Sequence, residues 1–203
     1  MTNMELSTNR IIGLYAPQNT GKTTIINWII KKIPMTKPIF IFDTNFERLS
    51  KYPQNTSNIK FIKAKTPSMQ DKPEFFNEVL LYIRAQYSDA YIVVEDIDKI
   101  LDSVKSSDDS EIYKLASDSR HQRFGFIYAT KEPNNIPPIL RSNTNLFFIG
   151  AFDEPAHVKV LSERVPKNTI LSLKQHEFIM LDRYDKTRQI VTMDNNELKI
   201  VVE

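Results

Sequence analysis

Short apolar runs alternate with segments of helical periodicity over the first three quarters of the chain. The runs are continuous instead of alternating with polar residues, and they cover Ile11 to Tyr15, Pro38 to Asp43, Ile59 to Ala64, Ala90 to Val94, Phe124 to Thr130 and Leu146 to Ile149. A strand that is apolar at successive positions is buried on both faces, which is typical of a parallel sheet between layers of helices. The pattern therefore predicts an α/β fold.

The segments between these runs carry helix signals. Residues Gly21 to Ile33 are amphipathic and stop before Pro34, and Pro73 to Tyr87 has apolar side chains at helical spacing. Glu111 to Gln122 follows Asp108, which has the side chain of a helix N-cap. This alternation predicts a mainly parallel sheet with helices on both faces.

The last quarter has a different pattern. Three short strand-like pieces, Phe178 to Leu181, Gln189 to Met193 and Leu198 to Val202, are separated by turn-like polar residues. We interpret them as an antiparallel β-hairpin that extends the sheet, contacts another subunit, or does both. We expect a single domain over residues 1–203, with a core at about 10–150 and a helical and β-hairpin extension at about 151–203.

A polar loop joins the first apolar run to the first predicted helix, in the order Tyr-Ala-Pro-Gln-Asn-Thr-Gly-Lys-Thr-Thr from Tyr15. Backbone N–H groups at a helix start have no partner within the helix, and together with the helix dipole they bind phosphate. Gly21 lets the backbone approach the phosphate, Lys22 supplies a charge to the β- and γ-phosphates, and the hydroxyl of Thr23 is a Mg²⁺ ligand. The pattern predicts an ATP-binding phosphate loop formed by Pro17, Gln18, Asn19, Thr20, Gly21, Lys22, Thr23 and Thr24.

One residue departs from the usual pattern of such a loop, because Ala16 occupies the position of the first glycine. Alanine tolerates a left-handed backbone poorly, so we expect the loop to begin in a conformation that is open to any L-residue. The alternative is a chance turn in front of a core helix. A strand before the loop and an amphipathic helix after it favour nucleotide binding.

Acidic residues follow the buried run at Tyr91 to Val94. In nucleotide hydrolases, one acid at such a strand end holds Mg²⁺, usually through water, and a second positions the attacking water. Glu95 and Asp96 occupy these two positions, in the reverse of the commoner order. Asp98 would point to the opposite face if the strand continued. The alternative is that these acids cap the loop and the following helix.

A third segment leads from a basic helix end into the run at Phe124 and ends at Pro133. Here the chain resembles the FtsK–HerA superfamily of P-loop motor ATPases, in which an Arg-His segment with a following glycine leads to a strand that ends in Ala-Thr-Gln-x-Pro. The matching residues are Arg120, His121, Gly125, Ala129, Thr130 and Pro133, and Ile139 to Thr144 resembles the segment before the last core strand of the family. The resemblance covers about residues 11–150 and implies a RecA-like fold.

Within this superfamily, the chain is most similar to the genome-packaging ATPases of membrane-containing icosahedral viruses, of the archaeal turreted virus type. The resemblance implies a homo-oligomeric ring, a hexamer or pentamer, that uses ATP and Mg²⁺ to thread double-stranded DNA into a preformed capsid. It also implies capsid or membrane-vertex proteins as partners, and a protein in the host cytoplasm or associated with the virion.

The same resemblance assigns further roles. Thr130 would sense the γ-phosphate, and an arginine of a neighbouring subunit would stabilise the transferring phosphoryl group. Arg120 is the leading candidate because it matches the family position, followed by Arg123 and Arg141; each is equally compatible with a plain surface role. Lys131 replaces the usual glutamine, so it contacts phosphate or an acid, or is simply solvated.

Composition narrows the range of partners. The 27 Lys and Arg residues nearly balance the 25 Asp and Glu residues, so bulk charge does not favour coating of nucleic acid. DNA is instead expected to meet a few loop lysines, with Lys63, Lys65 and Lys105 as candidates. The chain has no cysteine, which excludes disulfides and thiolate chemistry. We expect no transmembrane segment, no signal peptide and an intracellular protein.

Two other classes of function remain open from the residues. A HerA-like DNA helicase or processing ATPase shares every motif, although such proteins usually carry an additional N-terminal domain. A non-motor P-loop protein, such as a small-molecule kinase or a nucleotide-dependent switch, would act without DNA and without a ring. Kinases generally need an arginine-rich lid over the acceptor, and no clear segment of this kind is found.

Overall fold

The computed structural model describes residues 10–42, 52, 57–64, 73–101, 111–194 and 197–201, and for residues 118–122 it describes the backbone only. Several residues named above lie outside the described ranges: Asp43, Lys65, Lys105, Asp108 and Val202. The side chains of Arg120 and His121 belong to the segment of which only the backbone is described.

The strands form one nine-stranded sheet with the order β3-β2-β4-β5-β1-β6-β7-β8-β9. Its first six strands pair in parallel. They are β1 (Ile11–Tyr15), β2 (Ile39–Phe42), β3 (Ile59–Ile62), β4 (Tyr91–Val94), β5 (Gly125–Thr130) and β6 (Leu146–Gly150). Each corresponds to one of the continuous apolar runs, so the predicted α/β fold with a mainly parallel sheet is confirmed.

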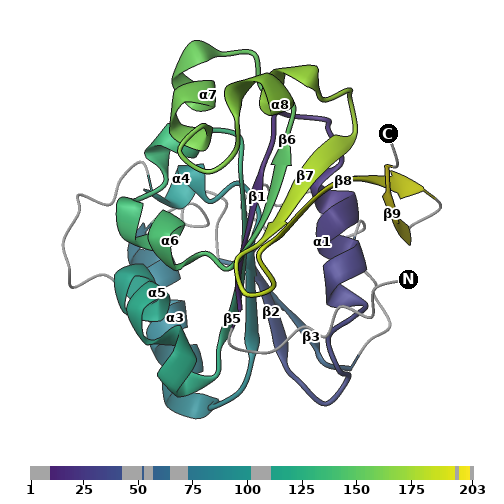
Figure 1. Cartoon of the computed structure of the whole chain (residues 1–203). Helices are drawn as coiled ribbons and strands as arrows, with labels where there is room; N and C mark the ends of the chain where they lie inside the picture. The colour runs from purple at the N-terminus through teal and green to yellow at the C-terminus, as the bar shows by residue number, and fades with distance from the viewer. Residues whose placement is uncertain are drawn as a thin grey trace.

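The C-terminal strands continue this sheet in antiparallel pairing. β7 (Glu177–Asp182) pairs with β6, β8 (Thr187–Asp194) with β7, and β9 (Glu197–Ile200) with β8. The predicted hairpin is therefore a three-stranded extension of the main sheet, as Figure 1 shows. In this register Phe178 lies opposite Gly150, which brings the start of β7 to the end of β6.

Helices cover both faces of the sheet, unequally (Figure 1). One face carries α3 (Pro73–Gln86), α4 (Asp98–Leu101), α5 (Glu111–Gln122), α6 (Pro138–Asn143) and α7 (Pro155–Leu161), and the other carries α1 (Lys22–Ile30). A 3₁₀ turn, η2 (Pro133–Asn135), and a short helix, α8 (Lys167–Ser172), complete the described helices. Among the described residues, no helix has both the length and the apolar character needed to cross a membrane.

Helix α1 ends earlier than predicted. The expected end was Ile33, next to Pro34, but α-helical geometry stops at Ile30. Lys32 and Ile33 then donate backbone hydrogen bonds to residues three positions earlier, Ile29 and Ile30. The last turn thus tightens before the proline, which is a common way for a helix to end.

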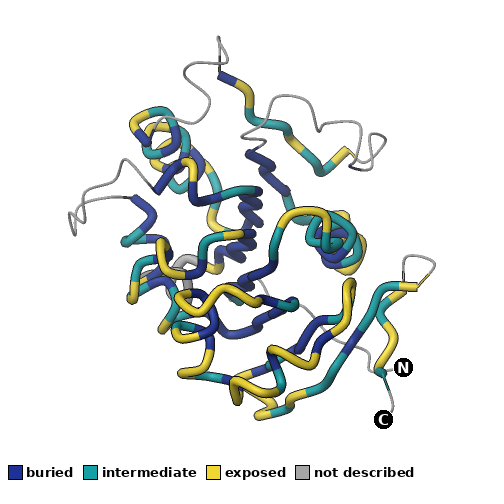
Figure 2. Tube along the Cα trace, turned by 90° about the horizontal axis from the view of Figure 1, so that it is seen from above, coloured by how far each residue is buried: buried dark blue, intermediate teal, exposed yellow. Residues whose placement is uncertain are grey.

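Two hydrophobic clusters lie on the two sides of the sheet. The larger cluster joins the strands to α3, α4, α5, α6 and α7, and the smaller one joins them to α1 and to Val191 of β8. Figure 2, viewed from above, shows the buried strands between helices whose outer surfaces are exposed. Because α1 packs on β8 and β9 as well as on the parallel strands, the C-terminal extension supports the helix that follows the phosphate loop.

Candidate nucleotide-binding site

The carboxyl ends of the parallel strands meet at one edge of the sheet. The loop after β1 starts there, and the backbone N–H of Ala16 donates to the carbonyl of Thr130 at 3.1 Å. Ile97, just after the acids that follow β4, donates to the carbonyl of Ala129 at 3.0 Å. Three segments predicted to act together are thereby held together by backbone hydrogen bonds. Ligands of open α/β sheets bind at this edge.

The loop has the backbone form of an anion cradle. Asn19 and Gly21 have left-handed backbones, with φ of 62° and 102°, and the hydroxyl of Thr20 donates to the carbonyl of Pro17 at 2.8 Å. Turns with left-handed residues direct successive N–H groups into a common concavity. Gly21 is the N-cap of α1 and provides no side-chain cap, so the first N–H groups of that helix remain available to a phosphate.

Lys22 spans this loop. Its Nζ atom donates to the carbonyl oxygens of Ala16 and Pro17, both at 2.6 Å. The ammonium therefore lies across the mouth of the loop, where a phosphate group would meet it. Thr23 follows at the first turn of α1 and is half-buried. The positions of these two residues agree with the predicted roles of a phosphate-binding lysine and a metal-binding hydroxyl, which remain predictions.

Ala16 fits at the first-glycine position because its neighbour is a glycine. Its backbone φ is not positive, as the sequence led us to expect, and its side chain is fully buried. A Cβ atom added to Gly150 would lie 2.8 Å from the Cβ of Ala16 and 3.4 Å from Cε1 of Phe178. The methyl group that is unusual in the loop thus occupies space that a side chain on β6 would otherwise fill.

The acids after β4 lie beside this loop with different degrees of burial. Glu95 is buried, with 2% of its surface exposed, whereas Asp96 is half-buried and has a left-handed backbone with φ of 49°. The strand does not continue past Val94, because the chain turns and enters α4 at Asp98. The expectation of a continuing strand with Asp98 on the opposite face therefore does not apply.

Asp98 is instead bonded to the end of β5. It accepts hydrogen bonds from the hydroxyl of Thr130 and, at 3.1 Å, from the backbone N–H of Lys131. Burial raises the pKa of the Asp98 carboxyl above its usual value, although the hydrogen bonds from Thr130 and Lys131 oppose this shift. Sequence reasoning did not assign Asp98 this contact, because a four-residue helix leaves no periodic signal.

Thr130 is fully buried, and its hydroxyl makes two hydrogen bonds within the protein. It donates to Asp98 and accepts from the backbone N–H of Glu132 at 2.9 Å. Its role as γ-phosphate sensor stays a prediction, with Asp98 as the partner that fixes the hydroxyl. The side chain of Lys131 is exposed at the same strand end.

The residues present fit a nucleotide with its metal. A hydroxyl and carboxylates are the oxygen ligands that Mg²⁺ prefers, and here they come from Thr23 and from Glu95 or Asp96. A Cβ added at Gly21 would lie 3.7 Å from Nδ1 of His176, an ordinary van der Waals distance, so this histidine borders the loop. When bound, Mg²⁺ would neutralise charge that develops on the phosphates.

A residue that sequence reasoning did not select also touches the loop. Nδ1 of His176, just before β7, lies 3.1 Å from the carbonyl oxygen of Thr20. Phe178 also approaches the loop, because its Cε2 atom would lie 4.0 Å from a Cβ added at Gly21. No local pattern indicates this contact, because 156 residues separate the two partners and only the pairing of β6 with β7 brings them together.

A second histidine links the end of β5 to the C-terminal third of the chain. His157 of α7 is buried, with Nε2 3.0 Å from Glu132 and Nδ1 3.2 Å from Glu154. Its ring also lies edge-on to Phe152, with ring centroids 5.3 Å apart. The end of β5 is thus connected to the helix that follows β6.

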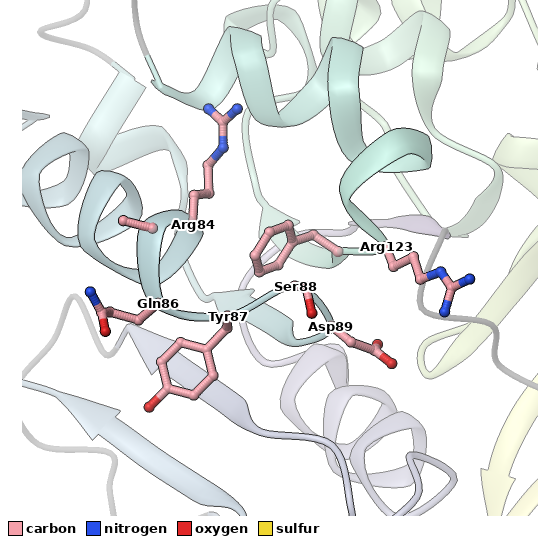
Figure 3. Close-up of a pocket in the computed structure, with 8 residues that line it drawn as sticks. Arg84, Gln86, Tyr87, Ser88, Asp89 and Arg123 are labelled. Atoms are coloured by element: carbon pink, nitrogen blue, oxygen red, sulfur yellow. The ribbon is translucent and has the colours of Figure 1, made fainter.

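Of the arginines predicted to reach a neighbouring subunit, Arg123 and Arg141 have described side chains. Arg123 is exposed at the turn between α5 and β5, on the edge of the sheet opposite the phosphate loop. It lines a cavity of about 620 Å³ together with Arg84, Tyr87, Ser88 and Asp89, and Figure 3 shows Arg84 and Arg123 on opposite sides of this cavity. Arg141 is half-buried in the last turn of α6.

Comparison with a known protein family gives one match. The model of the family named ATPase family associated with various cellular activities (AAA) matches residues 12–150, which include the phosphate loop, the acids after β4 and the end of β5. No curated protein matches the sequence.

Solved structures with similar folds include the genome-packaging NTPase B204. B204 from Sulfolobus turreted icosahedral virus 2 in complex with ATP-gammaS has a TM-score of 0.74 at 17% identity, over 91% of this chain and 98% of B204. B204, described as the DNA-packaging ATPase from Sulfolobus turreted icosahedral virus, has a TM-score of 0.75 at 16% identity, with the same coverage. At these identities the matches show the fold, and they confirm the RecA-like fold that the motifs indicate.

A conjugation protein has a similar fold over part of its length. The pCW3 conjugation coupling protein TcpA, with ATPgS, has a TM-score of 0.65 at 12% identity, over 89% of this chain and 60% of TcpA. The fold is thus shared with proteins whose described roles differ.

Proposed function

The chain belongs to the AAA family of ATPases, and from this premise we propose that it is a motor that hydrolyses ATP to translocate double-stranded DNA and packages a viral genome into a preformed capsid. The observation that supports this proposal most is the convergence of three segments at one edge of the sheet. The loop at Lys22, the acids at Glu95 and Asp96, and the strand end at Thr130 are joined there by backbone hydrogen bonds.

Each segment has a distinct role in the proposed hydrolysis. Backbone N–H groups of the loop and the Lys22 ammonium hold the β- and γ-phosphates, and Thr23 and Glu95 hold Mg²⁺, Glu95 through water. Asp96 or Glu95 orients the attacking water. Thr130, held by Asp98, reports the loss of the γ-phosphate to β5 and its neighbours.

Assembly of several copies into a ring, pentameric or hexameric, would complete the site. An arginine in trans is worth roughly 10³ to 10⁵ in rate in enzymes that use one. We keep Arg120 as the first candidate because it matches the motif. Arg123 lies at the edge of the sheet opposite its own phosphate loop, so it can serve only the site of another copy.

The proposed DNA contact relies on a small number of lysines. The formal net charge of the chain is only +2, so strong attraction over the whole surface is not expected. Lys63 is exposed after β3 and is the described member of the lysines proposed to contact phosphates. DNA affinity should therefore fall with salt, with a small slope that reflects a few phosphate contacts. The proposed setting is the host cytoplasm or the assembling virion, with capsid or membrane-vertex proteins as partners.

ATP hydrolysis measured with and without linear double-stranded DNA, together with native mass, tests this function. We expect oligomers whose hydrolysis rises when DNA is added. Transfer of phosphate to a small acceptor by a monomer, with no effect of DNA, would contradict the motor. DNA-stimulated oligomers that separate strands, but do not fill empty capsids of the cognate particle, would contradict packaging and favour a HerA-like helicase or processing ATPase.

A further inference from the structure

The order of the strands determines the side of the phosphate loop on which a nucleotide base must lie. The acids after β4 are two strands away from β1 on one side, whereas β6 and β7 lie on the other side. The γ-phosphate must face these acids, because they hold the metal and the water in the proposed function, on which this step rests. The nucleoside therefore leaves the loop toward the end of β6 and the start of β7.

The side chain of His176 contacts the phosphate loop on this side. Its backbone is left-handed, with φ of 68°, and its carbonyl accepts a hydrogen bond from the hydroxyl of Thr192 at 3.2 Å. Its imidazole is exposed while Nδ1 lies 3.1 Å from the carbonyl oxygen of Thr20. The backbone of His176 is thus held by β8, and its ring is oriented by the loop through Nδ1.

The contact with Thr20 determines the tautomer of this ring. A carbonyl oxygen only accepts hydrogen bonds, so Nδ1 must carry the proton and donate it. In the neutral imidazole, Nε2 then has a lone pair and accepts. No hydrogen bond joins Nε2 to any residue that the structure describes. The phosphate loop is therefore flanked, on the base side, by an oriented hydrogen-bond acceptor.

We propose that His176 selects the nucleotide base, with Nε2 accepting a hydrogen bond from the exocyclic amino group of adenine. Adenine presents an amino donor at the position where guanine presents a carbonyl acceptor. Two acceptors that face each other make no hydrogen bond, so guanine gains no affinity from the same contact. A site that hydrogen-bonds one substrate discriminates against an analogue that leaves its polar group unpaired.

A single substitution separates the roles of the two ring nitrogens of His176, because it can keep the donor at Nδ1 and remove the acceptor at Nε2. In His176→Asn the side-chain amide can still donate to Thr20 in place of Nδ1, and asparagine tolerates a left-handed backbone, but nothing replaces Nε2. Gln175→Ala, at the exposed neighbouring position, is the matched control. The probes are the β,γ-imido analogues of ATP and GTP and inorganic triphosphate, each with Mg²⁺, titrated by calorimetry.

We expect the wild-type chain to bind the adenine analogue about ten-fold more tightly than the guanine analogue, the value of about one good hydrogen bond. His176→Asn should lose this factor through weaker adenine binding, and its affinity for the guanine analogue and inorganic triphosphate should not change. Gln175→Ala should behave as the wild type.

Equal affinity of the wild-type chain for the two analogues would overturn the proposal. A uniform loss of all three ligands in His176→Asn would also overturn it, because the histidine would then only support the loop. If the wild-type chain binds both the guanine analogue and inorganic triphosphate, the triphosphate-binding site of the proposed function is supported independently of any role of His176 in base selection. Failure to bind any triphosphate would instead contradict the proposed function, and the base contact with it.

Discussion

We predict that residue 150 must be glycine, because the methyl group of Ala16 in the phosphate loop occupies the space that a side chain at position 150 would need. In Gly150→Ala the new Cβ would lie 2.8 Å from the Cβ of Ala16, whereas carbon atoms pack best at about 3.5 to 4.0 Å. Gly150 is the last residue of β6, and Ala16 directly follows the neighbouring strand β1. Phe178 of β7, the register partner of Gly150, would be 3.4 Å from the same new atom. Because neither neighbour is the free end of a flexible chain, overpacking should cost about 1–3 kcal/mol of unfolding free energy.

The companion substitution Ala16→Gly removes the atom that causes this clash. Alone, it should cost about 1 kcal/mol through the lost buried methyl group and the greater freedom of glycine in the unfolded chain. In the double variant Ala16→Gly/Gly150→Ala, the nearest remaining contacts of the new Cβ are Phe178 at 3.4 Å and the backbone of residue 16 at 3.6 Å. The double variant should therefore be more stable than the sum of the single effects allows, by about 1–2 kcal/mol.

Guanidinium unfolding of the four proteins measures this coupling, and ATP binding provides a second readout. The carbonyl of Ala16 accepts from Lys22 at 2.6 Å and its N–H donates to Thr130 at 3.1 Å, so a displaced loop should weaken ATP binding in Gly150→Ala and recover in the double variant. Additive free energies, or a Gly150→Ala variant as stable as the wild type, would refute the idea that the missing glycine of the loop is compensated on β6.

Two further predictions concern buried hydroxyl groups. Thr130→Val removes one of the two described hydrogen bonds to the Asp98 carboxylate and the Thr130 acceptor of the Glu132 N–H, and should cost about 1–3 kcal/mol in urea unfolding. Thr130→Ser should retain most of the stability, and equal stability of Thr130→Val and the wild type would argue against this network. Burial raises the pKa of Tyr91 and of Tyr128 from 10.0 to about 12, so their stabilising effect is complete below pH 10 and is lost as the pH rises from 10 to about 12. Unfolding free energies and tyrosinate absorbance across this range test the second prediction, and a pH-independent free energy would contradict it.

Most strands could be predicted from the sequence because five of the six parallel strands are buried on both faces; β3, at the edge of the sheet, is only partly buried. The residues of β1 and β5 are buried throughout, and no helix would bury every side of such a short segment. The end of α1 was less predictable, because Pro34 marks the latest position at which the helix can end, whereas the tightened turn at Lys32 depends on local packing. Helices α6 and α8 have six residues each, too few to show a periodic pattern.

The candidate site likewise contains residues that the sequence predicts and contacts that it does not. The loop around Lys22 and the acid at Glu95 could be found because their residue types are contiguous and each has a local chemical reason. The contacts of Asp98 with Thr130 and of His176 with Thr20 join residues 32 and 156 positions apart, and they exist only because of the strand order. Similarly, the reason for the unusual Ala16 lies on another strand, at Gly150.

Hydrolysis of ATP by Lys22→Ala tests the central claim most directly. Lys31→Ala is the matched control, because Lys31 is an exposed lysine at the other end of the same helix. Turnover should be measured with and without linear double-stranded DNA, and guanidinium unfolding should confirm that both variants are folded. The account predicts DNA-stimulated hydrolysis in the wild type and in Lys31→Ala, and none in a folded Lys22→Ala. Unchanged turnover in Lys22→Ala would contradict it.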